Sequence, residues 1–164
     1  MRNNPNRIRE YDDYAILIVE KRDHTIFEII IDKDDIDKVS QYRWRNNGAN
    51  YFKTPKGLYL HRFLMDCNDT DLRVDHIDGN PLNCSKSNLR ICTEQQNRMN
   101  NKRQSNNTSG HSGITYRKDT SKWSASIQVN YRVIRLGCFS TLEEAIEARR
   151  QAEIEYFGEY RRVD

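Results

Sequence analysis

The segment 97–113, "NRMNNKRQSNNTSGHSG", is the feature that most limits how this chain can fold. It consists almost entirely of Asn, Ser, Gly and basic residues, so it has no side chains with which to build a core. The whole chain of 164 residues is only 36% hydrophobic, with a mean hydropathy of −0.96. We therefore predict small modules rather than one large core, with a domain boundary here and a basic, Asn-rich linker at 101–112.

Composition also excludes several classes of protein. No run of 18 apolar residues exists, and the polar start "MRNNPNRIRE" does not resemble a secretory signal. We expect a soluble protein that stays in the cytoplasm of its host cell. The cysteines Cys67, Cys84, Cys92 and Cys138 form no C-x-x-C pair, which argues against a zinc ribbon. We expect four reduced thiols packed as small apolar groups.

Residues 1–57 have the pattern of a β-rich region. The apolar runs "YAILIVE" and "TIFEIII" have strand length, and "GANYFKTPKGLYLHRF" follows with hairpin-type turns. Between them, "DKDDIDKVSQY" predicts a short helix with acidic residues in its first turn.

The region 113–164 predicts a three-stranded antiparallel sheet backed by one helix. "ITYRK", "KWSASIQV" and "VIRLGCF" are separated by turn residues, and Trp123 lies on the apolar face of the middle strand. The helix in "STLEEAIEARRQAEIEYFG" offers two overlapping capping boxes, and Gly158 follows as a stop. Its predicted apolar stripe is Leu142, Ala145, Ala148, Ala152 and Tyr156.

Positive charge is concentrated in one part of the chain. Residues 86–135 carry ten Lys or Arg against two acids, whereas residues 136–164 carry a net charge of −3, mostly on the predicted helix. A concentrated positive field indicates a polyanionic partner, and the sheet face opposite the helix is the expected contact surface. A basic face that is merely solvated is the plain alternative.

The stretch "VDHIDGNPLNCSKSNLRICTEQQN", residues 74–97, carries the candidate chemistry. Phosphodiester hydrolysis needs a hard divalent ion and a group that takes a proton from water. Asp75 and Asn97 offer oxygen ligands, and His76 has a pKa near the working pH. Asn80 and Asn83 suit the intervening turn, and Thr93 with Gln96 predicts a helix start. An Asn-rich turn without function is the alternative.

The spacing of this stretch resembles the HNH endonuclease family. The matching residues are "DH", an Asn twelve residues after the His, and a second Asn nine residues later. The resemblance implies a ββα-metal unit over residues 58–100 that binds one Mg²⁺ or Mn²⁺ ion. It implies metal ligands at Asp75 and Asn97, a general base at His76, and a loop-bracing residue at Asn88. The upstream "YLHRFLM" places His61 and Arg62 beside the site. Many members have His where this chain has Asn97.

The last third, "SGITYRK…KWSASI…RLGCFSTLEEAIEARRQA", resembles the AP2 DNA-binding domain. That resemblance implies a sheet laid in the major groove, with side chains on its polar face reading bases and others near phosphates. The DNA contacts expected on this sheet and in the basic segments before it are Arg90, Lys102, Arg103, Thr115, Arg117, Lys122, Ser126, Gln128, Arg132 and Arg135.

Together these features predict an α+β protein: a metal-dependent HNH endonuclease of phage or homing type that acts on double-stranded DNA. We expect a monomer or homodimer with no membrane or protein partner. Two alternatives stay open at this point. One is a non-catalytic AP2-like transcriptional regulator, and the other is an RNA-binding module.

Overall fold

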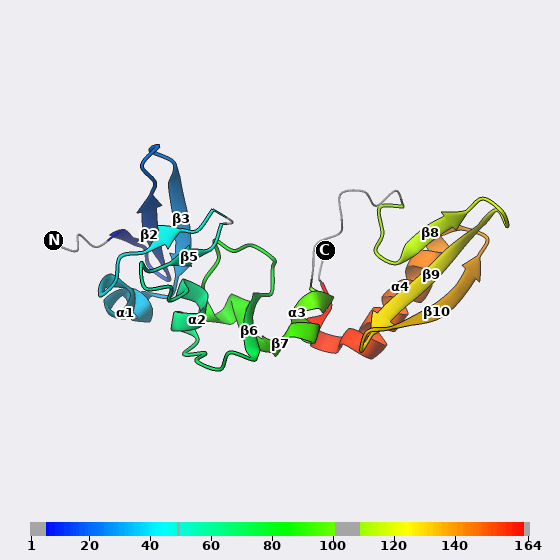
Figure 1. The fold of residues 1–164 in the computed structure, drawn as a ribbon. Helices are drawn as coiled ribbons and strands as arrows, with labels where there is room; N and C mark the ends of the chain where they lie inside the picture. Colours follow the sequence, from blue (N-terminus) through cyan, green and yellow to red (C-terminus); the bar gives the residue numbers. More distant parts are fainter. Residues whose placement is uncertain (1–5, 49, 101–108, 163–164) are drawn as a thin grey trace. The chain divides into compact units, whose positions relative to one another are not determined.

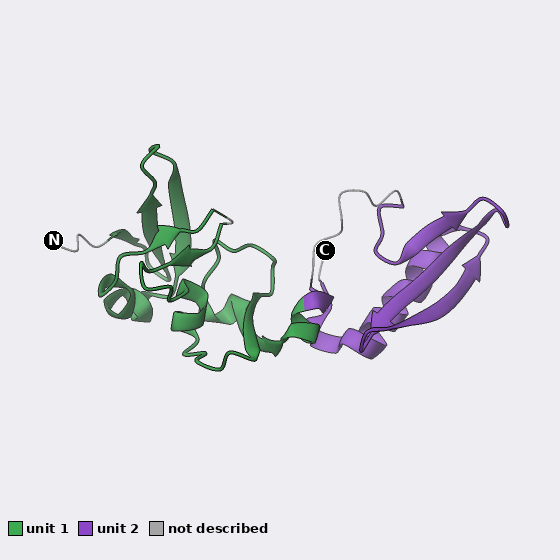
Figure 2. Ribbon diagram, in the orientation of Figure 1, with its two compact units in different colours: residues 1–97 green, residues 98–164 purple. Residues whose placement is uncertain are grey.

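The computed structural model describes residues 6–48, 50–100 and 109–162. It is a mixed α+β protein with small antiparallel sheets, and it divides into two compact units, residues 1–97 and 98–164 (Figures 1 and 2). Most of the predicted linker, together with Lys102 and Arg103, lies outside the described residues.

Among its described residues, the first unit contains three small antiparallel sheets, of which the largest has the strand order β1-β2-β3. Its elements, in chain order, are β1 (Arg7–Glu10), β2 (Ala15–Glu20), β3 (Ile26–Ile31), η1 (Lys33–Asp35), α1 (Ile36–Ser40), β4 (Arg45–Asn46), β5 (Phe52–Lys53), α2 (Leu60–Leu64), β6 (Leu72–His76), η2 (Lys86–Asn88), β7 (Leu89–Thr93) and α3 (Glu94–Met99), the last of which crosses into the second unit. The short helix predicted after β3 is confirmed as η1 and α1.

A single hydrophobic core runs through this unit. Leu17 and Ile29 of the N-terminal sheet belong to the same buried cluster as Leu64, Val74 and Leu89 of the HNH-like stretch. Burial of these aliphatic side chains is the main contribution to the stability of both the N-terminal sheet and the HNH-like stretch. The β-rich N-terminal region and the HNH-like stretch are therefore packed as one body.

The N-terminal sheet also holds the loop that follows β6. The Ile30 amide donates to the Leu82 carbonyl at 2.8 Å, and the Cys84 amide donates to the Ile30 carbonyl at 2.9 Å. Lys86 completes the junction, because its amide donates to Asp32 Oδ2 at 2.9 Å and its Nζ to Asp35 Oδ1 at 2.7 Å. Loop 82–86 thus lies along β3 as a short parallel addition to the sheet.

The second unit confirms the predicted sheet and helix. Its strands β8 (Ile114–Arg117), β9 (Lys122–Val129) and β10 (Arg132–Phe139) are antiparallel in the order β10-β9-β8, and α4 (Leu142–Phe157) packs on them before η3 (Gly158–Tyr160). The apolar face of β9 forms the core with this helix, and Trp123 packs against it as predicted.

Two details of α4 differ from or refine the prediction. Of the two overlapping capping boxes, the structure forms the one between Thr141 and Glu144. Tyr156 was expected in the apolar stripe, but it is 38% exposed and Phe157 is buried in its place. Burying Phe157 avoids the cost of desolvating a tyrosine hydroxyl.

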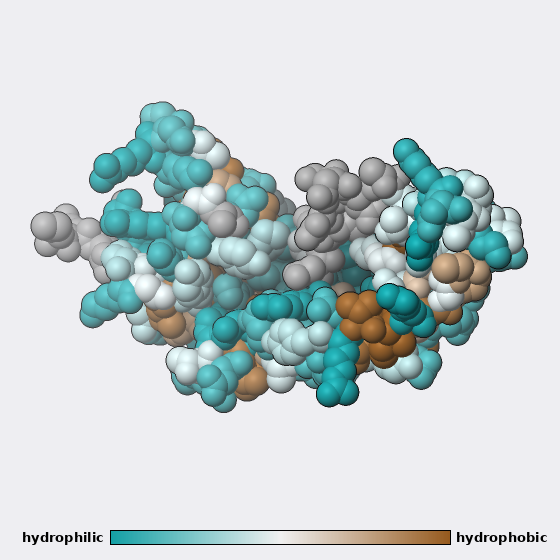
Figure 3. Space-filling view, turned by 45° about the vertical axis from the view of Figure 1, so that its right-hand side comes forward, coloured by the Kyte–Doolittle hydropathy of each residue, from teal (hydrophilic) through white to brown (hydrophobic). Residues whose placement is uncertain are grey.

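The four cysteines are free, and Cys67, Cys84 and Cys92 are buried as predicted. The prediction that all four are packed is wrong for Cys138, which is exposed on β10. The face of the protein shown in Figure 3 is mainly hydrophilic, with small separate hydrophobic patches. No helix among the described residues has the length and apolar character needed to cross a membrane.

Candidate active site

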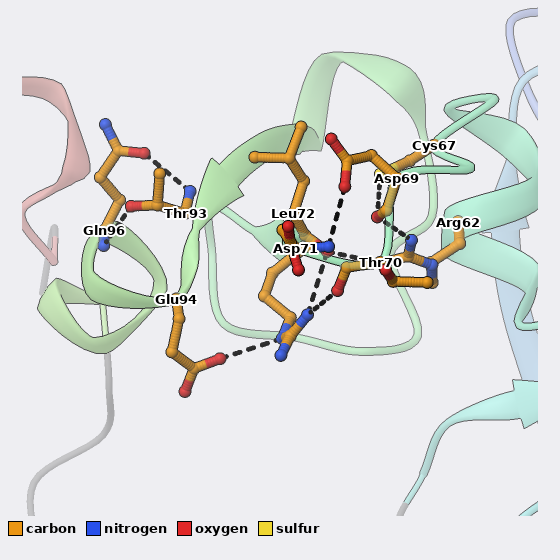
Figure 4. Close-up of polar contacts among 10 residues, drawn as sticks. Arg62, Cys67, Asp69, Thr70, Asp71, Leu72, Thr93, Glu94 and Gln96 are labelled. Atoms are coloured by element: carbon orange, nitrogen blue, oxygen red, sulfur yellow. Dashed lines mark hydrogen bonds and ion pairs between the residues drawn. The ribbon is translucent and has the colours of Figure 1, made fainter.

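Strand, loop, strand and helix follow one another in the candidate site. β6 pairs antiparallel with β7, with Asp75 opposite Arg90 and His76 opposite Leu89. The predicted helix start is confirmed, because Thr93 and Gln96 cap α3 reciprocally: the Thr93 amide donates to Gln96 Oε1 at 2.8 Å and the Gln96 amide to Thr93 Oγ1 at 3.2 Å (Figure 4).

His76 ends β6 and lies in a cluster of rings. It is only 3% exposed, and its ring centroid lies 5.5 Å from that of His61 and 6.0 Å from that of Tyr51. Burial lowers the pKa of His76, although Asp75 and Asp78 act in the opposite direction. Burial, followed by the charges of His76 and Arg62, lowers the pKa of His61 to about 3. Both imidazoles are therefore neutral at neutral pH, and neutral imidazole can accept a proton.

Asn88 crosses the loop that follows His76. Its side chain donates to Asp78 Oδ1 at 2.9 Å and to the Asn83 carbonyl at 2.8 Å, and accepts from the Asp78 amide at 3.0 Å. The Asn80 side chain accepts from the Leu82 amide, so it shapes the same turn. This geometry is what a loop-bracing role for Asn88 requires.

Asp78 is the acceptor at the centre of this loop. Burial acts to raise its pKa, but hydrogen bonds from Asn80, Asn83 and Asn88 lower it on balance. Sequence reasoning did not single out Asp78, although an Asp two residues before an Asn is a common turn pattern. It also missed Tyr51, which reaches His76 from a distant segment and has no local sequence pattern.

Asp75 is buried and bound to Arg90. Its Oδ2 accepts from Arg90 Nε at 3.0 Å and from Arg90 Nη2 at 2.7 Å. This ion pair follows from the strand register, which places the two residues directly opposite each other. Arg90 was predicted to contact DNA, and that contact stays a prediction.

The predicted donors are oxygen atoms, which suit a hard divalent cation, but there are few of them. Within the described ranges, no group of three or more His, Cys, Asp or Glu side chains is arranged to hold a metal ion. The predicted oxygen donors are the Asp75 carboxylate and the half-buried Asn97 amide on α3. Mg²⁺ is commonly held by one or two carboxylates, with water and phosphate in its other positions. A cation at Asp75 would share that carboxylate with Arg90.

Arg62, labelled in Figure 4, and Arg73 hold the turn before β6 through hydrogen bonds to its backbone carbonyls. Arg62 donates to the Leu72 carbonyl at 2.7 Å and to the Asp69 carbonyl at 2.6 Å. Arg73 pairs with Glu94 at 2.9 Å and so ties β6 to the start of α3. Both of these Arg62 contacts are with backbone carbonyls, and its predicted place beside the site stays a prediction.

Most predicted DNA contacts of the second unit lie on the sheet face opposite α4. Ala125 and Ile127 pack in the helix-side cores, so their neighbours in β9 alternate onto the other face. The strand register pairs Arg135 with Ser126 and Arg117 with Lys122, so these arginines lie on that same face. Arg132 pairs with Val129 and stands at the end of the sheet. The exposed members are Thr115, Arg117, Lys122, Gln128, Arg132 and Arg135, and Ser126 is half-buried.

Comparison with known proteins points to one family. Residues 67–99 match the HNH endonuclease family. The chain is 41% identical over 54 residues to Protein 3.8 of Escherichia phage T7, which covers 33% of this chain and 45% of that protein. It is 33% identical over 130 residues to the uncharacterized HNH endonuclease L560 of Acanthamoeba polyphaga mimivirus, covering 74% of this chain and 66% of that protein.

No solved structure gives a significant match. The chain spans 45% and 66% of the lengths of the two relatives. The family match covers β6, β7 and α3, and therefore Asp75, His76, Asn88 and Asn97. The chain thus contains an HNH endonuclease domain and has a viral HNH endonuclease homologue, which supports a nuclease.

Proposed function

We propose that this protein is a metal-dependent HNH endonuclease that hydrolyses phosphodiester bonds in double-stranded DNA. The observation that carries the proposal is a buried His76 that follows Asp75 at the end of a strand whose next loop is braced by Asn88. A neutral base beside a hard oxygen ligand is the pair that phosphodiester hydrolysis needs.

Each residue of the site has a distinct task. Asp75 and Asn97 would hold one Mg²⁺ or Mn²⁺ ion, which supplies charge neutralisation at the phosphate and at the leaving oxygen. His76 takes the proton from the attacking water. The Asn88 hydrogen bonds keep the loop after His76 in one conformation. His61, held neutral by burial, packs against His76 without adding positive charge.

The second unit and the basic segment before it supply DNA affinity in this proposal. Five basic or amide side chains (Arg117, Lys122, Gln128, Arg132 and Arg135) are exposed on the sheet or at its end, which suits an AP2-like reading of the groove. Phosphate contacts of this kind make binding strongly salt-dependent. Both relatives are viral, which agrees with a phage or homing-type enzyme acting on DNA inside a host cell.

One observation favours the alternative of a non-catalytic DNA-binding regulator. The Asp75 carboxylate already has a cation partner in Arg90, at 2.7 Å. If this ion pair excludes a metal ion, the HNH domain would serve only as a scaffold for the DNA-binding sheet.

A plasmid assay separates the two functions. Supercoiled plasmid is incubated with wild type in Mg²⁺, with wild type in EDTA, and with His76→Ala in Mg²⁺. We expect relaxation or linearisation only in the first reaction. His24→Ala is the matched control, because His24 lies in an exposed turn, where its ring contacts Glu20, and this variant should cleave like wild type. A wild type that binds DNA but never cuts plasmids carrying its own flanking sequence would support the regulator.

A further inference from the structure

A hollow in the first unit gathers positive charge from two separate segments. Its volume is about 430 Å³, and its lining includes Lys21 and Arg22 from the turn after β2, and Arg43, Arg45 and Asn46 from the segment leading into β4. Trp44 is buried between the two arginines, so Arg43 and Arg45 project on the same side of an extended segment. The fold thus brings four cations to one hollow.

Three of these four cations, Arg22, Arg43 and Arg45, form no ion pair in the part of the chain that the structure describes. The fourth, Lys21, lies with its Nζ over the Phe27 ring, 5.0 Å from the ring centroid. Glu20 is the acid in the lining, and its carboxylate is shared between Arg7 at 3.7 Å and His24 at 3.0 Å. An unneutralised cluster of arginines attracts anions, because guanidinium groups match phosphate oxygens in shape and charge.

The wall of the hollow at Trp44 and Asn46 is firmly held. The Trp44 amide donates to Asn6 Oδ1 at 2.7 Å, and Asn6 Nδ2 donates to the Trp44 carbonyl at 3.1 Å. Asn46 Oδ1 accepts from the Gly48 amide at 2.8 Å. The backbone that carries Arg43 and Arg45 is therefore anchored on both sides of Trp44.

We propose that this hollow is a second DNA-binding site, which holds phosphates of the duplex backbone. This inference rests on the proposed function, since it assigns a further contact to the same DNA. The volume is that of a small-ligand pocket, and the charged lining suits phosphate rather than a base or an apolar group. The site lies in the same unit as His76, so it contributes affinity to the unit that carries the candidate chemistry.

The test uses full-length His76→Ala protein in EDTA, so that binding is measured without cleavage. Fluorescence anisotropy with a labelled duplex gives the affinity between 50 and 200 mM salt. The variant Arg22→Gln/Arg43→Gln/Arg45→Gln removes three cations of the hollow. Arg9→Gln/Lys33→Gln/Lys56→Gln is the matched control, because it removes three exposed positive charges elsewhere in the same unit.

Each lost phosphate contact lowers the slope of log affinity against log salt by about 0.9. Over this fourfold range of salt, wild type should therefore lose roughly 40-fold more affinity than the hollow variant. The control variant should keep a slope near that of wild type.

Several results would overturn the inference. A hollow variant with the wild-type slope, or a control variant with an equal loss, would show that the hollow holds no DNA phosphate. Inorganic phosphate is titrated by NMR in parallel: binding in the hollow with an unchanged DNA slope would identify a site for free anions instead. If the parent protein does not bind duplex DNA at all, the proposed function fails, and this inference fails with it.

Discussion

The contact between Lys86 and Asp35 gives the sharpest prediction about stability. The Asp35 side chain is only 3% exposed, and its Oδ1 accepts from Lys86 Nζ at 2.7 Å. Asp35 Oδ2 is buried without a hydrogen-bond partner among the described residues. Lys86→Met would leave a buried carboxylate without its cation while keeping most of the side chain's length. Breaking a fully buried ion pair costs about 3–5 kcal/mol.

The cost expected for Lys86→Met is lower than that of breaking a fully buried ion pair. The Lys86 side chain is 46% exposed, so solvent screens part of the interaction. We therefore expect Lys86→Met to lower the free energy of unfolding of the first unit by about 2 kcal/mol. Lys38→Met is the control, because Lys38 pairs with Asp66, whose side chain is 78% exposed, and should cost at most about 1 kcal/mol.

Urea denaturation followed by tryptophan fluorescence measures these values. A Trp123→Phe background leaves Trp44, which is buried in the first unit, as the reporter. The double variant Asp35→Asn/Lys86→Met removes both charges and should recover part of the loss. The reasoning is wrong if Lys86→Met costs no more than Lys38→Met, or if the double variant is as unstable as the single one.

Three further predictions concern activity and pH. Asn88→Ala should lower plasmid cleavage about 10- to 100-fold while Mn²⁺ binding is retained, and an unchanged rate would remove its bracing role. Burial lowers the pKa of His76, so its neutral form persists below pH 6.5. The cleavage rate should therefore start to fall only when the pH drops below 6.5, and a fall that begins above pH 6.5 would exclude His76 as the base. Deletion of residues 108–164 should weaken duplex binding and relax site choice, and unchanged site choice would exclude the sheet as the reader.

The parts of the fold that the sequence predicted are those governed by local rules. The β6–β7–α3 stretch follows from turn residues and a capping pair that are close in sequence, Thr93 with Gln96. The sheet of the second unit follows from strict alternation in β9. The sequence placed Tyr156 in the core where the structure has Phe157. Helical periodicity alone cannot decide which of two neighbouring residues is buried at the end of a helix.

The contacts that the sequence did not predict join distant segments. The contacts of Lys86 with Asp35 and of Tyr51 with His76 join residues far apart in the sequence, so no periodicity or short motif encodes them. The same holds for the basic hollow, whose two segments are separated by β3 and α1. The ion pair of Asp75 with Arg90 depends on strand register, which the motif spacing does not specify.

The shared core of the first unit limits how far the HNH motif can be transplanted. The family match begins at residue 67, yet Val74 and Leu89 are buried against side chains that come from residues 15–64. A graft of the matched stretch alone would expose this apolar surface and lose the strand that supports loop 82–86. Protein engineers who wish to move the HNH motif into another scaffold would need to carry residues 6–99 as one segment, so that α3 with Asn97 stays whole.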